Sequence, residues 1–282
     1  MTFAIRAYHA FGIGQLLQSP KISTTVKLAE CLFARLHEQA LRSVHGVPGL
    51  HWVGNCNELN AGYAADGYAR INGVGAVITT FGVGEISAVN AIAGAYAEPA
   101  LFVHIVSTAG RSIQDSRAKA HHTFNDGNLQ WFAQICAAIT VAQASMRDAH
   151  STPDQIGTVL GQCLSSNRPV YIQMPVDMVD VTVTVANSRL QSSLLHEKFT
   201  NIWFAPSYDS VLSIVLEKIK TAKQPMILVE GESRALGITQ DVQSVVAITN
   251  WPTWTNIFGK GLVNEALTNV IEVLMIRKQK AE

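Results

Sequence analysis

Short apolar runs alternate along this chain with longer segments in which apolar residues recur every three or four positions. The runs predict strands at Ala76–Phe81, Leu101–Val106, Ala137–Ala142 and Val170–Met174. The longer segments predict helices at Glu58–Arg70, Glu85–Tyr96, Asp126–Gln134 and Pro153–Ser165. Largely apolar strands that alternate with helices are typical of a buried parallel sheet with helices on both faces. The pattern therefore predicts an α/β fold built on a doubly wound parallel sheet.

The start of this pattern contains a conflict. A helix is expected over Val26–Ala40, followed by strand-like runs at Ser43–Val47 and Leu50–Val53 that a Pro-Gly dipeptide separates. Neighbouring parallel strands normally need a crossover of about a dozen residues or more. Two alternatives follow, an antiparallel Pro-Gly hairpin or a local misfit of residues 43–49. We favour the misfit, because a hairpin would reverse the first strand of the sheet.

The rest of the chain predicts a second, smaller α/β unit. A helix is expected from Pro206 or Ser207 to about Ala222, and strands are expected at Met226–Val229 and Thr253–Ile257. The apolar residues from Ile271 onward have no sheet to join in this interpretation. The predicted organisation is an extension at 1–25, expected to be disordered, a first domain at 26–185, a linker at 186–204 and a partial second domain at 205–282.

Composition and charge narrow the functional classes. The 282 residues are 48% apolar and 15% charged, which is sufficient for a large buried core. Twenty-one basic and 21 acidic residues cancel, so we expect no binding to nucleic acid or to an anionic membrane. No apolar stretch reaches the ~18 residues of a membrane helix. The four cysteines form no CxxC pair, which favours reduced thiols and a cytoplasmic location.

Glu58 is the first candidate for chemistry. It stands in the first turn of a predicted helix, and Asn57 before it can cap that helix. A glutamate at this position is ordinarily stabilised by the helix dipole alone, so the position by itself does not indicate catalysis. The helix is also rich in small residues, which predicts a flat surface for close packing: Ala61, Gly62, Ala64, Ala65, Gly67 and Ala69.

Two loops supply the other candidates. His121 and His122 are adjacent and lack the i, i+4 spacing of a helical zinc site, so no metal site is predicted there. Gly82, Val83 and Gly84 connect a strand to a helix, as a phosphate loop does. However, no Lys-Ser or Lys-Thr pair follows, so an ordinary tight turn is the better interpretation.

Four segments carry a family resemblance. They are NCNELNAGYAADGYAR at Asn55–Arg70, TTFGVGEISAVNAIAGAYAE at Thr79–Glu98, HHT at His121–Thr123 and RPVYIQMPVDMV at Arg168–Val179. In this order they resemble the thiamine-diphosphate-dependent pyruvate decarboxylases of fungi. The resemblance covers about Lys27 to Leu262 and is most specific for the pyrimidine-binding domain of that family.

The resemblance implies an activity and a set of site residues. The activity is non-oxidative decarboxylation of a small 2-oxo acid, pyruvate to acetaldehyde and carbon dioxide, with thiamine diphosphate and Mg²⁺ as cofactors. Glu58 would exchange a proton with the aminopyrimidine ring, and His121 and His122 would relay later protons. The residues implied to contact the cofactor are Glu58, Thr80, Gly82, Val83 and Glu85.

The chain also departs from the family pattern. A crossover segment beginning DFNL, which supplies a catalytic Asp, is missing after Gly49, and Phe124–Asn128 stand where the family usually has LGNGD. The GDG motif that holds magnesium is absent, since the only DG pairs are Asp66-Gly67 and Asp126-Gly127. Activity of this chain alone is therefore doubtful. An inactive fragment, or a pseudoenzyme that associates with a full-length homologue, is the alternative.

The resemblance further implies association, as a homo-oligomer or with such a homologue. In the family a second subunit covers the two helices predicted at Glu58–Arg70 and Glu85–Tyr96. The side chains expected to be buried by that contact are Tyr63, Tyr68, Ala91, Ile92 and Tyr96.

Overall fold

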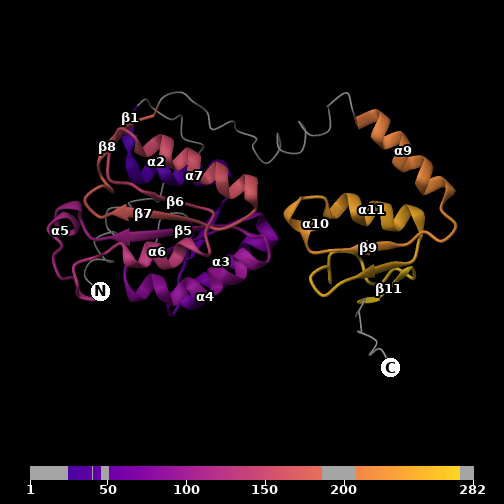
Figure 1. Ribbon diagram of the computed structural model, residues 1–282, viewed down its shortest axis with the longest axis horizontal. Helices are drawn as coiled ribbons and strands as arrows, with labels where there is room; N and C mark the ends of the chain where they lie inside the picture. The colour runs from indigo at the N-terminus through magenta and orange to yellow at the C-terminus, as the bar shows by residue number, and fades with distance from the viewer. Residues whose placement is uncertain (1–24, 40, 46–50, 186–207, 274–282) are drawn as a thin grey trace. The chain divides into compact units, whose positions relative to one another are not determined.

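The computed structural model describes residues 25–39, 41–45, 51–185 and 208–273. The chain divides into two compact units, Met1–Lys198 and Phe199–Glu282, each described here by itself (Figure 1). The predicted linker at 186–204 and the predicted extension, apart from Thr25, lie outside the described residues. Within the described parts of the chain, no helix is both long enough and apolar enough to cross a membrane.

The first unit is built on a six-stranded sheet in which every neighbouring pair is parallel, as the sequence predicted. The strand order is β3-β2-β4-β5-β7-β6. Their bounds are β2 Ser43–His45, β3 His51–Val53, β4 Val74–Thr80, β5 Leu101–Thr108, β6 Ala142–Ser145 and β7 Val170–Pro175. The two longest strands, β4 and β5, pair over seven positions at the centre of the sheet, from Val74 opposite Leu101 to Thr80 opposite Ser107.

Helices cover both faces of this sheet (Figure 1). One layer holds α2 (Leu28–Glu38) and α7 (Thr152–Ser166), and the other holds α3 (Glu58–Asn72), α4 (Val83–Ala97) and α6 (Trp131–Ala137). Side chains alternate along β5 between the layers. Val103 packs into the core cluster of α2 and α7, whereas Phe102 packs into that of α3 and α4. The apolar character of the central strands thus follows from burial on both sides.

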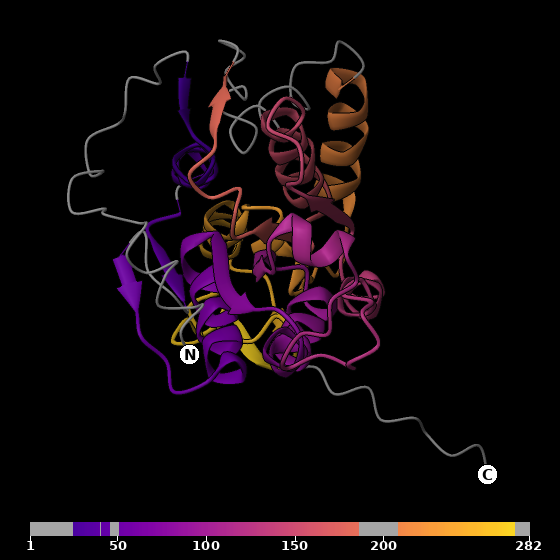
Figure 2. The same cartoon turned by 90° about the vertical axis from the view of Figure 1, so that its left-hand side faces the viewer.

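A short antiparallel ribbon, which the sequence did not reveal, lies beside α2. It pairs β1 (Thr25–Lys27) with β8 (Thr182–Thr184), so that Val26 faces Val183 (Figure 2). The ammonium group of Lys27 also lies 2.7 Å from the Asp180 carboxylate. The ribbon joins the two ends of the described part of the first unit.

The parallel pairing of β2 with β3 settles the conflict at the start of the sheet. Ser43 faces His51 and His45 faces Val53, so the antiparallel hairpin is wrong. Both strands have only three residues, so the chain returns by about 10 Å at ~3.3 Å per residue. The five residues between them, 46–50, lie outside the described residues but can span that distance. Short strands therefore remove the need for a long crossover.

Two further predictions around α6 were wrong. The strand expected at Ala137–Ala142 begins only at Ala142, because Ala137 still belongs to α6. The helix expected from Asp126 begins only at Trp131. The reason is the Asp126 carboxylate, which accepts hydrogen bonds from the Asn128 amide and from the Trp131 indole and so closes a turn before the helix.

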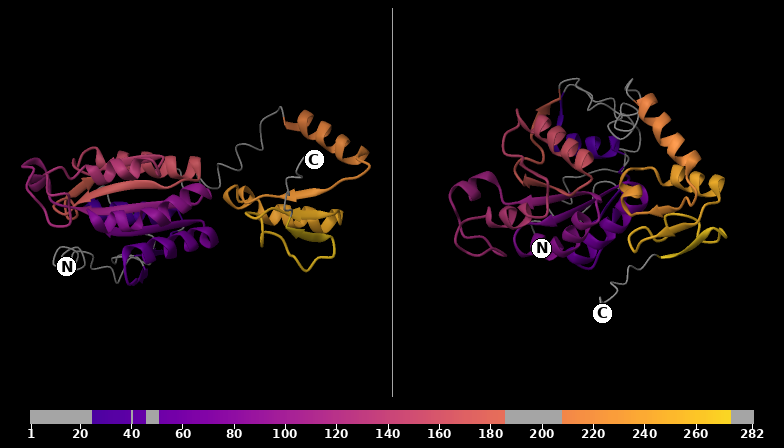
Figure 3. Two further views of the ribbon diagram at one scale, coloured as in Figure 1. Left: turned by 60° about the horizontal axis from the view of Figure 1, so that its bottom comes forward. Right: turned by 45° about the vertical axis from the view of Figure 1, so that its right-hand side comes forward.

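The second unit contains a three-stranded parallel sheet in the order β11-β10-β9. Its elements are α9 (Tyr208–Thr221), β9 (Ile227–Val229), α10 (Glu232–Ala235), α11 (Thr239–Thr249), β10 (Thr253–Thr255) and β11 (Val270–Val273). Val246 of α11 packs against Val229 of β9 on one face of this sheet (Figure 3). The expectation that Ile271 has no sheet to join was wrong, since β11 pairs with β10. The apolar side chains of α9 are exposed, with Val211 at 55% and Ile214 at 56%.

The contact between α3 and α4 corrects the expected subunit interface. Ala91 and Ile92 are 0% exposed within this chain, so neither is available to a partner. A Cβ atom placed on Gly62 would lie 2.8 Å from Cβ of Ala91, closer than two such atoms can pack. The flat surface predicted for α3 is therefore used against α4. Tyr63, at 49% exposure, remains on the surface.

The two interior glycines of α3 give opposite predictions for the same substitution. Gly67→Ala should raise the free energy of unfolding by ~1 kcal/mol, because Ala favours helix and nothing lies within 4 Å of the new methyl group. Gly62→Ala should lower it by about 1–3 kcal/mol through overpacking against Ala91. Urea unfolding of both variants measures this. Equal effects of the two substitutions would show that α3 and α4 do not pack as described.

Candidate active site

Three segments that follow β3, β4 and β5 converge at the carboxyl edge of the first sheet. Glu58 begins α3 shortly after β3, the histidine pair lies in the loop after β5, and turn 81–84 runs from the end of β4 into the first two residues of α4. The side chain of Asn57 accepts a hydrogen bond from the Asn60 amide at 2.8 Å, as predicted for a helix cap. Glu58 is thus held at the start of α3, with its carboxylate at the end of the sheet.

The turn 81–84 packs directly against Glu58. A Cβ atom on Gly84 would lie 3.0 Å from Glu58 Oε1 and 2.5 Å from Thr80 Cγ2. Because glycine stands there, the carboxylate reaches the backbone of the turn. The structure therefore brings together Glu58, Thr80 and Gly84, which the sequence places in three different elements.

The histidine loop packs against the other side of the same turn. The amide of Val83 donates a hydrogen bond of 3.0 Å to the carbonyl oxygen of His122. Gly82 has a φ angle of +83°, and a Cβ atom there would overlap that carbonyl oxygen, so only glycine fits. The rings of His121 and His122 are exposed, with centroids 3.9 Å apart. One turn thus contacts both the acid and the histidine loop.

The loop that follows the histidines is ordered by its own side chains. Asn125 and Gly127 adopt φ angles of +61° and +76°, in the left-handed region that asparagine and glycine tolerate better than other residues. The Thr123 hydroxyl donates to the Ala120 carbonyl at 2.6 Å. The Asn128 amide and the Trp131 indole lower the pKa of the exposed Asp126 carboxyl, since they donate to its ionised form.

Glu85, which was predicted to contact the cofactor, lies beneath the turn with 1% exposure. Its Oε1 atom accepts a hydrogen bond from the Gly82 amide at 2.9 Å, and its Oε2 atom accepts one from the Tyr171 hydroxyl at 2.5 Å. The amide of Gln173 reaches the same hydroxyl at 3.4 Å. Both carboxyl oxygens are therefore committed to partners inside the protein.

Burial shifts the pKa values of Glu85 and of the side chains around it. Burial raises the pKa of Glu85 to about 7, although the Tyr171 and Gly82 hydrogen bonds oppose that rise. Burial and the charge of Glu85 raise the pKa of Cys136 to about 12, and the same causes raise the pKa of Tyr171. Burial also lowers the pKa of His104 to about 3, so its ring is neutral where it contacts the edge of Tyr171.

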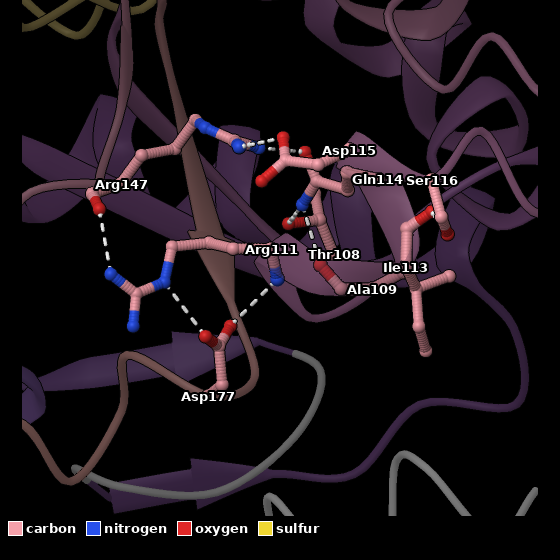
Figure 4. Close-up of polar contacts among 9 residues, drawn as sticks. All are labelled: Thr108, Ala109, Arg111, Ile113, Gln114, Asp115, Ser116, Arg147 and Asp177. Atoms are coloured by element: carbon pink, nitrogen blue, oxygen red, sulfur yellow. Dashed lines mark hydrogen bonds and ion pairs between the residues drawn. The ribbon is translucent and has the colours of Figure 1, made fainter.

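The segment before the histidines is anchored to the ends of β6 and β7 by contacts that sequence reasoning missed (Figure 4). Arg111, which begins α5 (Arg111–Asp115), donates through its backbone amide and through Nε to the Asp177 carboxylate, at 3.0 and 2.7 Å. Arg147 donates to the Gln114 side chain at 2.7 Å and pairs with Asp115. Only Asp177 lay in a segment that the sequence analysis had singled out.

An open pocket of about 550 Å³ lies beside this anchor. Its lining residues are Gln114, Asp115, Arg117, Gly127, Asn128, Leu129, Gln130, Ser145 and Arg147. None of the predicted site residues is among them. Nowhere in the described parts of the chain do three His, Cys, Asp or Glu side chains gather in a way that could hold a metal ion.

The buried carboxyl group predicts a pH-dependent stability. Because the folded chain raises the pKa of Glu85 from 4.5 to about 7, it holds this proton more tightly than the unfolded chain does. Stability from this group is complete below the unfolded pKa and is lost as the pH rises through 7. Between pH 5 and pH 8, the wild type should lose about 2–3 kcal/mol relative to Glu85→Gln. Urea unfolding across this range measures the difference, and a difference that does not vary with pH would contradict the prediction.

Comparison with known proteins agrees with this geometry. Residues 26–131 match the family model described as "Thiamine pyrophosphate enzyme, N-terminal TPP binding domain". The chain is 49% identical over 271 residues to pyruvate decarboxylase of Aspergillus parasiticus, a match that covers 90% of this chain and 46% of the relative. It is 42% identical over 258 residues to pyruvate decarboxylase of Aspergillus fumigatus, covering 86% of this chain and 45% of the relative.

A yeast relative matches a similar share of this chain and of its own length. Pyruvate decarboxylase isozyme 1 of Saccharomyces cerevisiae is 34% identical over 255 residues, covering 85% of this chain and 45% of the relative. The chain therefore spans about half the length of the curated relatives it matches. The doubly wound sheet, the family model and these similarities agree: residues 26–131 carry the N-terminal TPP binding domain of thiamine pyrophosphate enzymes, in a chain that is similar over most of its length to part of the pyruvate decarboxylases.

Proposed function

We propose that this chain supplies the aminopyrimidine side of a thiamine diphosphate site for the non-oxidative decarboxylation of a 2-oxo acid, most simply pyruvate. The observation that carries the proposal is the convergence on turn 81–84, where Glu58 Oε1 lies against Gly84 and the His122 carbonyl accepts from Val83. A proton-exchanging acid and a histidine loop thus flank one short stretch of backbone.

The residues at this turn fit an aminopyrimidine ring. Gly82 and Gly84 are buried against the His122 carbonyl, Glu58 and Thr80, and the side chain of Val83 between them is 52% exposed. A flat aromatic ring can lie against this exposed Val83 side chain, with the Thr80 methyl group as a second apolar contact. The Glu58 carboxyl group is partly buried at the same place, so it can hold a proton at a ring nitrogen away from bulk water.

The residues divide the proton transfers between them. Thiamine diphosphate, when bound, supplies a nucleophilic carbon and accepts the electron pair left by the departing carbon dioxide. Glu58 delivers and recovers the proton at the pyrimidine nitrogen. His121 and His122, with exposed and neighbouring rings, exchange protons between solvent and the reacting atoms. Glu85 contributes through the turn that it supports.

The diphosphate and its Mg²⁺ require residues beyond those described here. The sequence offers no GDG motif, and the chain spans about half the length of its relatives. We propose that the remaining part of the site comes from another polypeptide segment or from a second, full-length subunit, in a cytoplasmic enzyme. The alternative is that this chain is an inactive form that only associates with such a subunit.

The 282-residue chain alone should bind thiamine diphosphate weakly and should not decarboxylate pyruvate, because nothing in its described part anchors the diphosphate through a metal ion. Isothermal titration with and without Mg²⁺ measures the binding, and acetaldehyde release measures the activity. Micromolar, magnesium-dependent binding would show that this chain already contains the diphosphate site.

Glu58 can be tested once the site is completed. The chain would be joined to the part of the Aspergillus parasiticus relative that it does not cover. In this chimera Glu58→Gln should lower kcat by ~100-fold or more, because an amide cannot exchange the proton.

Asp154→Asn is the matched control, since Asp154 is also an acidic residue in the first turn of a helix. It should leave kcat within about twofold, because loss of a helix-dipole contact alone costs only ~0.3–1 kcal/mol of stability. If both variants lost activity equally, or if Glu58→Gln kept wild-type turnover, Glu58 would have only the ordinary role of a first-turn acid.

A further inference from the structure

We propose that Tyr171 and Glu85 are positioning residues that hold turn 81–84, and through it the His122 loop, in the geometry of the candidate active site. The proposal rests on the proposed function for its meaning, since the turn matters only if it receives the cofactor ring. It goes beyond that function because neither residue needs to touch the ring. Both lie beneath the turn, on β7 and α4.

A continuous set of hydrogen bonds connects the centre of the sheet to the histidine loop. The Gln173 amide donates to the Tyr171 hydroxyl, which donates to Glu85. Glu85 accepts from the amide of Gly82, and the next amide, that of Val83, donates to the His122 carbonyl. Four hydrogen bonds thus link a buried strand to an exposed loop that lies much earlier in the chain.

Packing alone does not explain this pair. Tyr171 is 0% exposed, and phenylalanine would fill the same space without a buried hydroxyl group. Glu85 occupies the N3 position of α4, where a glutamate commonly caps a helix, but such caps normally lie at the surface. Here the carboxyl group is buried and accepts a second bond from a distant strand. A buried polar pair of this kind adds little stability compared with apolar side chains and instead fixes one arrangement.

Apart from the Gln173 side chain and the Gly82 amide, the described part of the chain offers this pair no further hydrogen-bond partner. Cys136 of α6 is the neighbouring ionisable group, and its thiol is protonated at ordinary pH because its pKa is about 12. His104 of β5 meets Tyr171 through a ring contact at 5.3 Å between centroids, and its Nε2 atom lies 2.9 Å from the Thr79 hydroxyl. Neither group competes for the Glu85 carboxylate.

The turn transmits this constraint because its backbone has little freedom. The Gly82 amide donates to Glu85, and the next amide along the backbone, that of Val83, donates to His122. Gly82 stays at a φ angle of +83° within this arrangement. If the Tyr171 hydroxyl is removed, the Glu85 carboxylate is free to rotate and the Gly82 amide loses its fixed acceptor. The contact between Val83 and His122 should then open more often.

The test is amide hydrogen exchange on the purified 282-residue chain, resolved by NMR, for wild type and Tyr171→Phe. The variant should raise exchange at Val83 and at residues 121–123 by roughly tenfold, as expected for the loss of a hydrogen bond to a charged group. Exchange in the centres of β4 and α7 should stay within about twofold of wild type. A role in global stability alone would instead raise exchange in all elements of the first unit together.

Tyr63→Phe is the matched control, because its hydroxyl accepts from Asn90 at 2.9 Å on the surface of α3 and α4. It should leave residues 121–123 unchanged. Unchanged exchange at Val83 and residues 121–123 in Tyr171→Phe, or a uniform rise across the unit, would overturn the proposal. If Tyr171→Phe does not fold, Glu85→Gln is measured against the same two outcomes.

No cofactor and no turnover enter this measurement, so its result is separate from that of the proposed function. A local rise in exchange supports the positioning pair even if the completed enzyme proves inactive after all. Unchanged exchange, together with loss of activity in Glu58→Gln, would remove the positioning pair and leave the proposed function in place.

Discussion

The candidate active site depends on two glycines at the end of β4, Gly82 and Gly84, because neighbouring groups occupy the space that a side chain would take there. Glu58, the His122 carbonyl and the Thr80 methyl group all approach positions where a Cβ atom on Gly82 or Gly84 would collide with them. Any other residue there would separate the acid from the histidine loop. The sheet fixes where β4 ends, and the two glycines allow Glu58 and the His122 loop to come together at that end.

The remainder of the first unit supports this convergence from two directions. From below, the buried pair of Glu85 and Tyr171 connects the turn to β7 in the centre of the sheet. From the side, Arg111 binds Asp177 at the end of β7, which anchors the segment that leads to the histidines. The small residues of α3, which fit closely against α4, keep the helix that begins at Glu58 in place. A local substitution in any of these contacts should therefore act at the turn.

The sequence was sufficient for the parallel sheet, because strands buried on both faces are continuous apolar runs that periodicity detects. It was insufficient where a contact is distant in the chain. The β1–β8 ribbon pairs Thr25 with Thr184, and nothing in either segment indicates the other. The late start of α6 depended on one side chain, Asp126, whose turn competes with helix. Glu85 was placed among the residues that contact the cofactor, because no pattern in the sequence indicates that it is buried against Tyr171.

The central claim is that turn 81–84 is a surface for an aminopyrimidine ring, and the most direct measurement uses that ring alone. A ¹⁵N-labelled chain is titrated with 4-amino-2-methylpyrimidine, which has no diphosphate and needs no metal ion. The account predicts amide shift changes confined to residues 58–60, 80–84 and 121–123, and weaker binding for Glu58→Gln. Shift changes centred on the pocket beside Arg147, or no changes at millimolar ligand, would contradict it.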